Sequence, residues 1–248
     1  MNKPPVEGMP WQEYAFERMM AANPFPSIMG RVCPAPCEDG CNRNEVEDFV
    51  GINAVEHYVG DWAIENGRTV EGPKVETDKR IAVVGGGFPE TQAPALAANR
   101  SLRGQIRAAL EGGMPAYGEC GGLIYLSRGV EWRGQRHEMV GFVPGDVVMG
   151  ERPVGRGYVR LRATGQSPWS DGPEELAAHE FHYAALENLP EGMRYAYEVT
   201  RGHGIDGDHD GLVLGNLLAS FSHQRHAARN PWAERFVGFV RACRKRGA

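Results

Sequence analysis

The stretch GECGGL, at 118–123, places a cysteine between glycines, with apolar residues on both sides. The preceding MPAY predicts a short strand, and the following GGLIYLSRGV predicts a helix. Glycines beside a cysteine permit the unusual backbone angles of a sharp strand-to-helix turn, and they leave room that a Cβ atom would fill. Such a turn presents the sulfur at the start of the following helix. The pattern therefore predicts a nucleophile at Cys120; the alternative is a buried cysteine in a glycine-rich turn.

A second group of thiols lies near the N-terminus, where GRVCPAPCEDGC has the spacing C-x3-C-x3-C. Cys33, Cys37 and Cys41 are soft ligands, and thiolates so spaced in one loop suit an iron–sulfur cluster or zinc. Coincidence is the alternative. The chain has five cysteines, an odd number, and they are unevenly spread. That distribution indicates a metal-binding or catalytic protein in a reducing compartment rather than a disulfide framework.

Two further strings resemble functional motifs but depart from them, and a third motif is absent. DGDHDG, at 206–211, begins like a calcium loop, yet its twelfth position is Leu217 where a glutamate is required, so we expect a turn. IAVVGGG begins like a dinucleotide-binding turn, but Glu90 occupies the position of the third glycine. The chain contains no G-x4-G-K-[ST] loop. We therefore expect neither a dinucleotide site nor ATP-dependent activation of a carboxylate by this chain alone.

Composition narrows the class of partner. The 248 residues are 42% hydrophobic and 24% charged, as in ordinary soluble proteins, and the net charge of −5 disfavours nucleic-acid binding. The one compact basic cluster, RACRKRGA at the C-terminus, reads as a solvated helix end. There is no run of 18 apolar residues, and the N-terminal MNKPPVEGMPWQEY lacks the features of a signal peptide. We expect a cytoplasmic protein with neither a membrane nor a nucleic-acid partner.

The elements that would position these residues fall into two parts. Residues 1–67 predict a small all-α, cysteine-rich domain with helices over 11–22 and 46–67, and the polar stretch 68–80 predicts a linker. Residues 81–248 predict an α/β domain, because strands and helices alternate there. The expected strands are 81–84, 114–117, 140–150, 157–164, 194–200 and 211–221, and the expected helices are 99–113, 121–130 and 231–245.

Five strings in the second part carry a resemblance to a known family. In chain order they are GGGFPE (85–90), ANRSL (98–102), GECGGLIYL (118–126), HEFHY (179–183) and GNLLASFSH (215–223). Over roughly 85–240 the chain resembles the glutaminase domain of cobyrinic acid a,c-diamide synthases, a branch of the class I glutamine amidotransferases. The resemblance implies a class I glutamine amidotransferase-like sheet with flanking helices. Those proteins have two strands before GGGFPE that are missing here, so we expect an open sheet edge.

The resemblance also implies roles for individual residues. Cys120 matches the nucleophile that takes the γ-glutamyl group of glutamine. His223 matches the histidine that deprotonates the thiol and then protonates departing ammonia. The backbone amides of Gly86 and Gly121 match the groups that stabilise the oxyanion. We interpret the histidines and the glutamate of HEFHY, at 179–183, as structural or interface-forming rather than catalytic.

The chain departs from the family around the histidine. Relatives often read ASYxHLHF where this chain reads ASFSHQRHA, and the glutamate that classical triads place two residues after the histidine is Arg225. A Cys–His dyad is therefore expected. Similar sequences occur beside dissimilatory sulfite reductase, so the tetrapyrrole carboxylate to be amidated is either cobyrinic acid or sirohaem. Glutamine hydrolysis itself needs no cofactor; ATP and Mg would enter only with an ATP-dependent synthetase partner.

The first part carries a separate resemblance, over roughly 10–67, to the helical iron–sulfur domain of the glutamate synthase small subunit and related NAD(P)H-linked oxidoreductases. In those proteins further cysteines complete the ligand set. No cysteine precedes Cys33 here, so a [4Fe–4S] cluster would need a fourth ligand from elsewhere, another subunit included. The alternative function is an electron-transfer or docking module with an inactive amidotransferase part, and a third reading is a fusion without chemistry.

Overall fold

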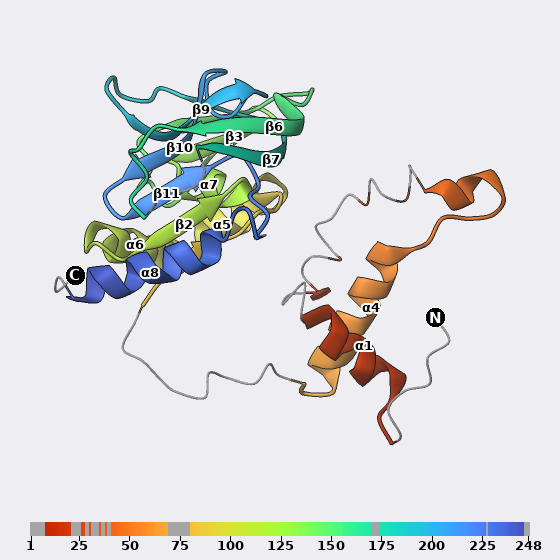
Figure 1. The fold of residues 1–248 in the computed structure, drawn as a ribbon. Coiled ribbons are helices and arrows are strands. Elements are labelled where there is room, and N and C mark those ends of the chain that lie inside the picture. The colour runs from red at the N-terminus through yellow and green to blue at the C-terminus, as the bar shows by residue number, and fades with distance from the viewer. Residues whose placement is uncertain are drawn as a thin grey trace. The chain divides into compact units, whose positions relative to one another are not determined.

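The computed structural model describes residues 8–20, 26–27, 30, 35, 38, 41–68, 80–169, 174–226 and 228–245. The chain divides into two compact units, Met1–Glu76 and Thr77–Ala248 (Figure 1). Cys33, Cys37 and most of the predicted linker lie outside the described residues. Within the described residues, no helix is both long and apolar enough to cross a membrane.

The helices of the first unit whose bounds the structure describes are α1 (Trp11–Met20), the short 3₁₀ helix η1 (Asn42–Glu45) and α4 (Ile52–Glu65). Helices α1 and α4 pack together, and the rings of Trp11 and Tyr58 stack with centroids 5.7 Å apart. The prediction of one helix over 46–67 is wrong at its start. Gly51 is the N-cap of α4, and the backbone freedom of glycine disfavours extension of the helix through this position.

In the second unit, helices and strands alternate over the first third, strands follow, and the helix α8 closes the unit. Its elements are β1 (Ala82–Val84), η2 (Pro89–Gln92), α5 (Ala93–Ala98), α6 (Arg100–Glu111), β2 (Ala116–Glu119), α7 (Gly121–Leu126), β3 (Gly129–Trp132), β4 (Gln135–Glu138), β5 (Asp146–Met149), β6 (Gly155–Ala163), β7 (Glu175–His182), β8 (Ala184–Glu187), β9 (Arg194–Arg201), β10 (His209–Leu214), β11 (Leu217–Ser220) and α8 (Trp232–Lys245).

These strands form two sheets. The larger has the order β1-β2-β11-β10-β9-β6-β7, and the smaller has the order β4-β3-β5-β8. The pairs β1–β2 and β2–β11 are parallel, whereas the remaining pairs of the larger sheet are antiparallel. The predicted α/β class, with a sheet flanked by helices, is therefore confirmed.

Two predicted elements divide in the structure. The expected strand over 211–221 is the hairpin of β10 and β11, because Gly215 takes a φ of +57° between the paired residues Leu214 and Leu217. The expected helix over 121–130 ends at Leu126, and the residues after it form β3. The stretch 206–211 begins as the predicted turn, since the Asp206 carboxylate accepts hydrogen bonds from the two following backbone N–H groups of Asp208 and His209.

The larger sheet is covered on both faces, because neighbouring residues of its strands point in opposite directions. Ala116 and Leu217 face a core with α5, α6, α7 and the smaller sheet. Tyr117 and Leu218 face the other core, against α8, which lies along the sheet in Figure 1. The carboxyl ends of β2 and β11 are thus held rigidly side by side between two apolar layers.

Among the described residues, one edge of the larger sheet has no further strand beside it. β1 is its outer strand, and Ile81 and Val83 are 46% and 57% exposed. Parallel strands are normally covered on both sides, and unpaired apolar edges favour association. The exposed β1 is the open edge that the resemblance predicts.

Candidate active site

Cys120 lies where β2 ends and α7 begins. Its backbone has φ 49° and ψ −105°, a conformation that non-glycine residues rarely adopt and that only a constrained turn maintains. The constraint comes from both sides, since the Cys120 N–H donates to the Ser220 carbonyl at 2.7 Å and the Cys120 carbonyl accepts from Ile124 N–H at 3.2 Å. The sulfur lies 3.8 Å from the Phe181 carbonyl oxygen. The backbone therefore holds the thiol in one fixed position.

The glycines around Cys120 are required by close backbone contacts. A Cβ atom on Gly121 would lie 2.5 Å from the Gly87 carbonyl oxygen, and one on Gly122 would lie 1.8 Å from the Val84 carbonyl oxygen. The loop after β1 thus packs directly on the first turn of α7. This contact explains why the sequence has glycines both in GGGFPE and in GECGGL.

The same packing brings together the residues that the sequence predicts for the site. A Cβ atom on Gly86 would lie 3.1 Å from Cε1 of His223 and 3.9 Å from the Cβ of Cys120. Gly86, Gly121, Cys120 and His223 are therefore neighbours, although they come from three separate stretches of the chain. The use of the two glycine amides as oxyanion donors stays a prediction.

His223 is held by its backbone and by its ring. It forms an isolated bridge with His179, in which His223 N–H donates to the His179 carbonyl at 2.7 Å and His179 N–H donates back at 3.3 Å. The two imidazole rings stack at 4.7 Å, with 10° between their planes. Nδ1 of His223 lies 2.8 Å from Oε1 of Glu119. Because Nδ1 is engaged, Nε2 is the ring nitrogen that remains for the sulfur.

Glu119 is the functional residue that the sequence reasoning misses. Its second oxygen, Oε2, accepts hydrogen bonds from the Tyr117 hydroxyl at 2.6 Å and from Gln224 N–H at 3.3 Å. Burial favours the protonated carboxyl, but the hydrogen bonds from His223, Tyr117 and Gln224 outweigh it and hold the pKa of Glu119 below its ordinary value. The carboxylate therefore stays charged beside His223.

These contacts set the protonation of His223. Burial alone would lower its pKa, but hydrogen bonds with Cys120 and Glu119, and the negative charges of both, raise the pKa to about 10. The imidazolium form therefore dominates at neutral pH. A histidine in this state is ready to donate a proton to a departing amine.

The sequence predicts a dyad of Cys120 and His223. In the structure the Glu119 carboxylate also contacts His223, although it does not come from the position two residues after the histidine. Arg225 occupies the place of the usual glutamate and is exposed, whereas Glu119 reaches His223 from the residue before the nucleophile. The strand register explains why Glu119 lies beside His223. Ser220, three residues before His223, pairs with Glu119 across the parallel strands β11 and β2. The signal available in the sequence was the carboxylate of GECGGL itself, at the end of a strand.

Asp210 fixes the segment that leads to His223. It is fully buried, and its carboxylate accepts hydrogen bonds from the N–H groups of Gly211, Phe221 and Ser222 at 2.8, 3.1 and 2.9 Å. Burial raises the pKa of Asp210, although these hydrogen bonds oppose the shift. The sequence pattern of 206–211 predicts only a turn, because two of the three partners of Asp210, Phe221 and Ser222, lie beyond the following hairpin.

Comparison with known proteins identifies the domain. Residues 62–231 match the model of the CobB/CobQ-like glutamine amidotransferase domain. The chain belongs to this family. Among curated proteins, the cobyrinate a,c-diamide synthase of Magnetococcus marinus is 43% identical over 158 residues, covering 64% of this chain and 34% of that protein. That of Methanosarcina acetivorans is 39% identical over 153 residues, covering 56% and 31%.

The chain therefore spans about a third of the length of these curated relatives. A solved structure of a glutamine amidotransferase covers 64% of this chain and 78% of its own, with 20% identity and a TM-score of 0.47.

The HEFHY string of this amidotransferase domain has two different roles. Glu180 and His182 are buried: Glu180 accepts hydrogen bonds from the N–H groups of His203 and Gly204 at 2.8 and 2.9 Å. The ring of His182 stacks on Phe221 at 4.1 Å. These contacts agree with the structural role expected for this string. The first histidine, at 179, differs because it contacts the ring of the predicted catalytic histidine.

The N-terminal part matches a second family. Residues 10–68 match the model of dihydropyrimidine dehydrogenase domain II, which carries a 4Fe-4S cluster. Of the three predicted ligands, only Cys41 is among the described residues; hydrogen bonds from the backbone N–H groups of Val50 and Arg43 lower the pKa of its thiol. A lowered pKa suits a ligating thiolate. The described residues contain no group of three side chains that could hold a metal ion.

Proposed function

We propose that residues 77–248 hydrolyse glutamine at Cys120 and supply the ammonia for amidation of a tetrapyrrole carboxylate. The observation that carries this proposal is the contact of His223 with both Glu119 and Cys120 at the end of a strained strand-to-helix turn. Membership of the amidotransferase family supports glutamine as the substrate of that site.

The reaction follows from the positions of these groups. In the ion pair of Cys120 and His223 the thiol proton already resides on Nε2 of His223, and the sulfur attacks the side-chain carbonyl carbon of glutamine as the thiolate. The oxyanion so formed is stabilised by the N–H groups of Gly86 and Gly121. His223 then protonates the leaving nitrogen, which departs as ammonia and leaves a thioester. Water, deprotonated by the now neutral His223, attacks the thioester, and glutamate leaves as the sulfur departs as thiolate and the ion pair with the His223 imidazolium re-forms.

Glu119 acts on the imidazole rather than on the substrate. Its Oε1 fixes Nδ1 as the protonated nitrogen, which directs Nε2 towards the sulfur, and its charge stabilises the imidazolium. Tyr117 and Gln224 hold the other oxygen, so the carboxylate cannot rotate away. The proposed catalytic set is therefore Cys120, His223 and Glu119.

Transfer to the acceptor requires a second component. The relatives are named cobyrinate a,c-diamide synthase, and this chain corresponds to about a third of their length. We assign ATP, Mg²⁺ and the tetrapyrrole to a separate synthetase partner. Cobyrinic acid and sirohaem are the two acceptors to compare, by mass spectrometry of each after incubation with this chain, the partner, ATP and glutamine.

Glutamine hydrolysis by the purified full chain tests the central proposal. The Cys120→Ala variant should release no glutamate above background and should melt at the wild-type temperature, whereas Cys41→Ala, a control in the first unit, should keep full activity. If the chain is inactive without its partner, a diazoketone analogue of glutamine should still alkylate wild type and not Cys120→Ala. Glutamate release or alkylation that survives Cys120→Ala would refute the proposal.

The first unit is proposed to hold an iron–sulfur cluster through Cys33, Cys37 and Cys41, with a fourth ligand from elsewhere. A cluster of this type carries single electrons. Protein purified without oxygen should contain iron and absorb visible light, and both should be lost in Cys41→Ser while Cys120→Ser keeps them. Colourless, iron-free wild-type protein would show that the three thiols bind no cluster.

A further inference from the structure

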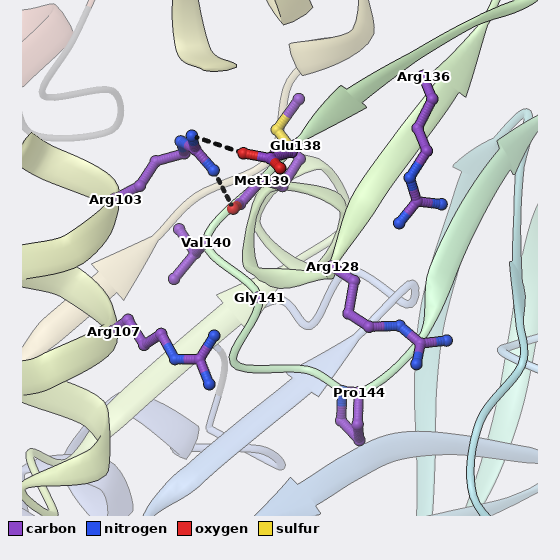
Figure 2. Close-up of a pocket in the computed structure, with 9 residues that line it drawn as sticks. All are labelled: Arg103, Arg107, Arg128, Arg136, Glu138, Met139, Val140, Gly141 and Pro144. Atoms are coloured by element: carbon purple, nitrogen blue, oxygen red, sulfur yellow. Dashed lines mark hydrogen bonds and ion pairs between the residues drawn. The ribbon is translucent and has the colours of Figure 1, made fainter. Parts of the chain in front are cut away.

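The amidotransferase unit contains a groove that its proposed chemistry does not use (Figure 2). A cavity of about 510 Å³ joins a second of about 490 Å³ through shared lining residues on α6 and β4. We call it the arginine groove, after the five arginines that line it: Arg100, Arg103, Arg107, Arg128 and Arg136. None of its lining residues belongs to the Cys120 site.

Two elements supply these arginines from opposite sides. Arg100, Arg103 and Arg107 are three and four residues apart on α6, so they share one face of the helix. Arg128 precedes β3, and Arg136 lies on β4. Figure 2 shows Arg103 and Arg107 of α6 on one side of the groove and Arg128 and Arg136 on the other.

The groove carries more positive than negative charge. Arg103 pairs with Glu138, Arg107 pairs with Glu111 at 2.8 Å, and two arginines share Asp146. Among the ion pairs of the described residues, none involves the side chain of Arg100. Five guanidinium groups therefore face three carboxylates, in a chain whose net charge is −5.

Several of these arginines are held in place before any ligand arrives. Arg128 and Arg136 donate to separate oxygens of Asp146, at 2.6 and 2.7 Å, and Asp146 is only 14% exposed. Arg103 is 12% exposed and donates to the Met139 carbonyl, while its buried Nε has no partner among the described residues. Each guanidinium has five N–H donors, so many remain free to bind a further acceptor.

A neighbouring glycine allows the approach of Arg107. Gly141 has a φ of +76°, and a Cβ atom there would lie 3.2 Å from NH1 of Arg107. In Figure 2 the guanidinium of Arg107 extends from α6 towards this glycine. The backbone at this point therefore leaves space for a cationic group that points across the groove.

We infer that the arginine groove binds a small anion with two or more oxyanion groups. Guanidinium forks match the geometry of phosphate and carboxylate oxygens, and two anchored forks opposite a third favour a multiply charged ligand over a single one. The volume is that of a small-molecule site. This inference does not depend on glutamine hydrolysis, since the groove and the Cys120 site share no residue.

Calorimetric titration of the full chain with pyrophosphate and, separately, with citrate tests the site and distinguishes phosphate from carboxylate ligands. Saturable binding of either anion, weakened by added salt, is expected. Arg107→Gln should weaken it about tenfold, because charge-assisted hydrogen bonds are lost. Arg160→Gln is the matched control: Arg160 is similarly exposed and also has one carboxylate partner, Glu175, but lies on β6.

Each result of these titrations either supports or overturns the anion site. Binding of pyrophosphate alone, of citrate alone or of both, with loss in Arg107→Gln and none in Arg160→Gln, supports the site and names its ligand chemistry. Absence of binding by both anions overturns the inference. Equal weakening by the two substitutions overturns it as well, because the attraction would then belong to the whole surface. The circular dichroism spectrum and melting temperature of each variant check that it is folded.

Discussion

The amidotransferase unit contains two Glu–His pairs that differ in sequence spacing, in burial and in the partners of the carboxylate. In the first, Nδ1 of His223 lies 2.8 Å from Glu119, and the two side chains are 22% and 18% exposed. In the second, Nε2 of His182 lies 3.7 Å from Glu180, and the side chains are 1% and 2% exposed. Only the first pair borders the nucleophile and has access to solvent.

The partners of each carboxylate explain the difference. Glu180 uses its two oxygens to bind the backbone N–H groups of His203 and Gly204, so it fixes a loop. Glu119 uses one oxygen for a histidine ring and the other for groups that keep the carboxylate in place. A buried Glu–His pair therefore stabilises the fold, whereas the accessible pair can move a proton to and from a substrate. Four predictions test this division.

The largest expected effect is on catalysis by the accessible pair. Glu119→Gln should lower the kcat for glutamine hydrolysis by about 10³-fold, because His223 loses the carboxylate that orients it and stabilises its charge. Some stability should be lost as well, because the new amide NH₂ must face either the Gln224 N–H or the Nδ1–H of His223, and the Tyr117 hydroxyl can accept from it only in the first case. Steady-state kinetics and thermal unfolding of the same preparation measure both. A variant with nearly wild-type kcat would show that the Glu119 contact is only structural.

Substitution in the buried pair, Glu180 and His182, should reduce the stability of the fold more than it reduces kcat. In Glu180→Gln an amide NH₂ must face one of the N–H groups of His203 and Gly204, and we expect a loss of about 2–3 kcal/mol in the free energy of unfolding. Urea unfolding measures it. The kcat of the folded protein should remain within about tenfold of wild type. Loss of activity without loss of stability would place Glu180 in the catalytic machinery.

Local sequence patterns could predict part of this arrangement. The helix α6 and the final helix α8 follow from amphipathic spacing, and the turn at Cys120 follows from its glycines. The end of α7 could not be read in this way, since the Ser127 hydroxyl bonds back to the Ile124 carbonyl and the next residues pair with β5. That pairing joins distant segments and leaves no periodic signal.

The candidate site likewise has a part that the sequence predicts and a part that it does not. Cys120 and His223 stand in recognisable strings, and the structure brings them together, whereas the contact between Glu119 and His223 spans 104 residues. It depends on the register between β2 and β11, which a single sequence does not specify. For the cysteine group at 33–41, two of the three residues lie outside the described part of the chain, so the predicted cluster stays a prediction.

The accessible pair should also make stability depend on pH. The pKa of His223 is raised from 6.5 to about 10, so its contribution is complete below pH 6.5 and is lost as pH rises towards 10. The pKa of Glu119 is lowered from 4.5, so its contribution is present above pH 4.5 and is lost as pH falls below it. The difference in unfolding free energy between wild type and Glu119→Gln should therefore be largest between pH 4.5 and 6.5 and shrink on the alkaline side. A constant difference would mean that His223 titrates alike in both proteins.

The smallest effect on kcat is expected at His179. Its ring stacks on His223, so it contacts the proposed catalytic residues without belonging to either Glu–His pair. Burial and the charge of His223 lower the pKa of His179, so we expect a neutral ring that restrains its neighbour and exchanges no proton. His179→Ala should lower kcat by roughly fivefold, an effect of about 1 kcal/mol on the barrier. His179→Phe should restore most of it, because a phenyl ring can form the same stack, and the pH profile of kcat/KM should keep its shape in both variants. A changed profile in His179→Phe would instead assign His179 a proton of its own in the reaction.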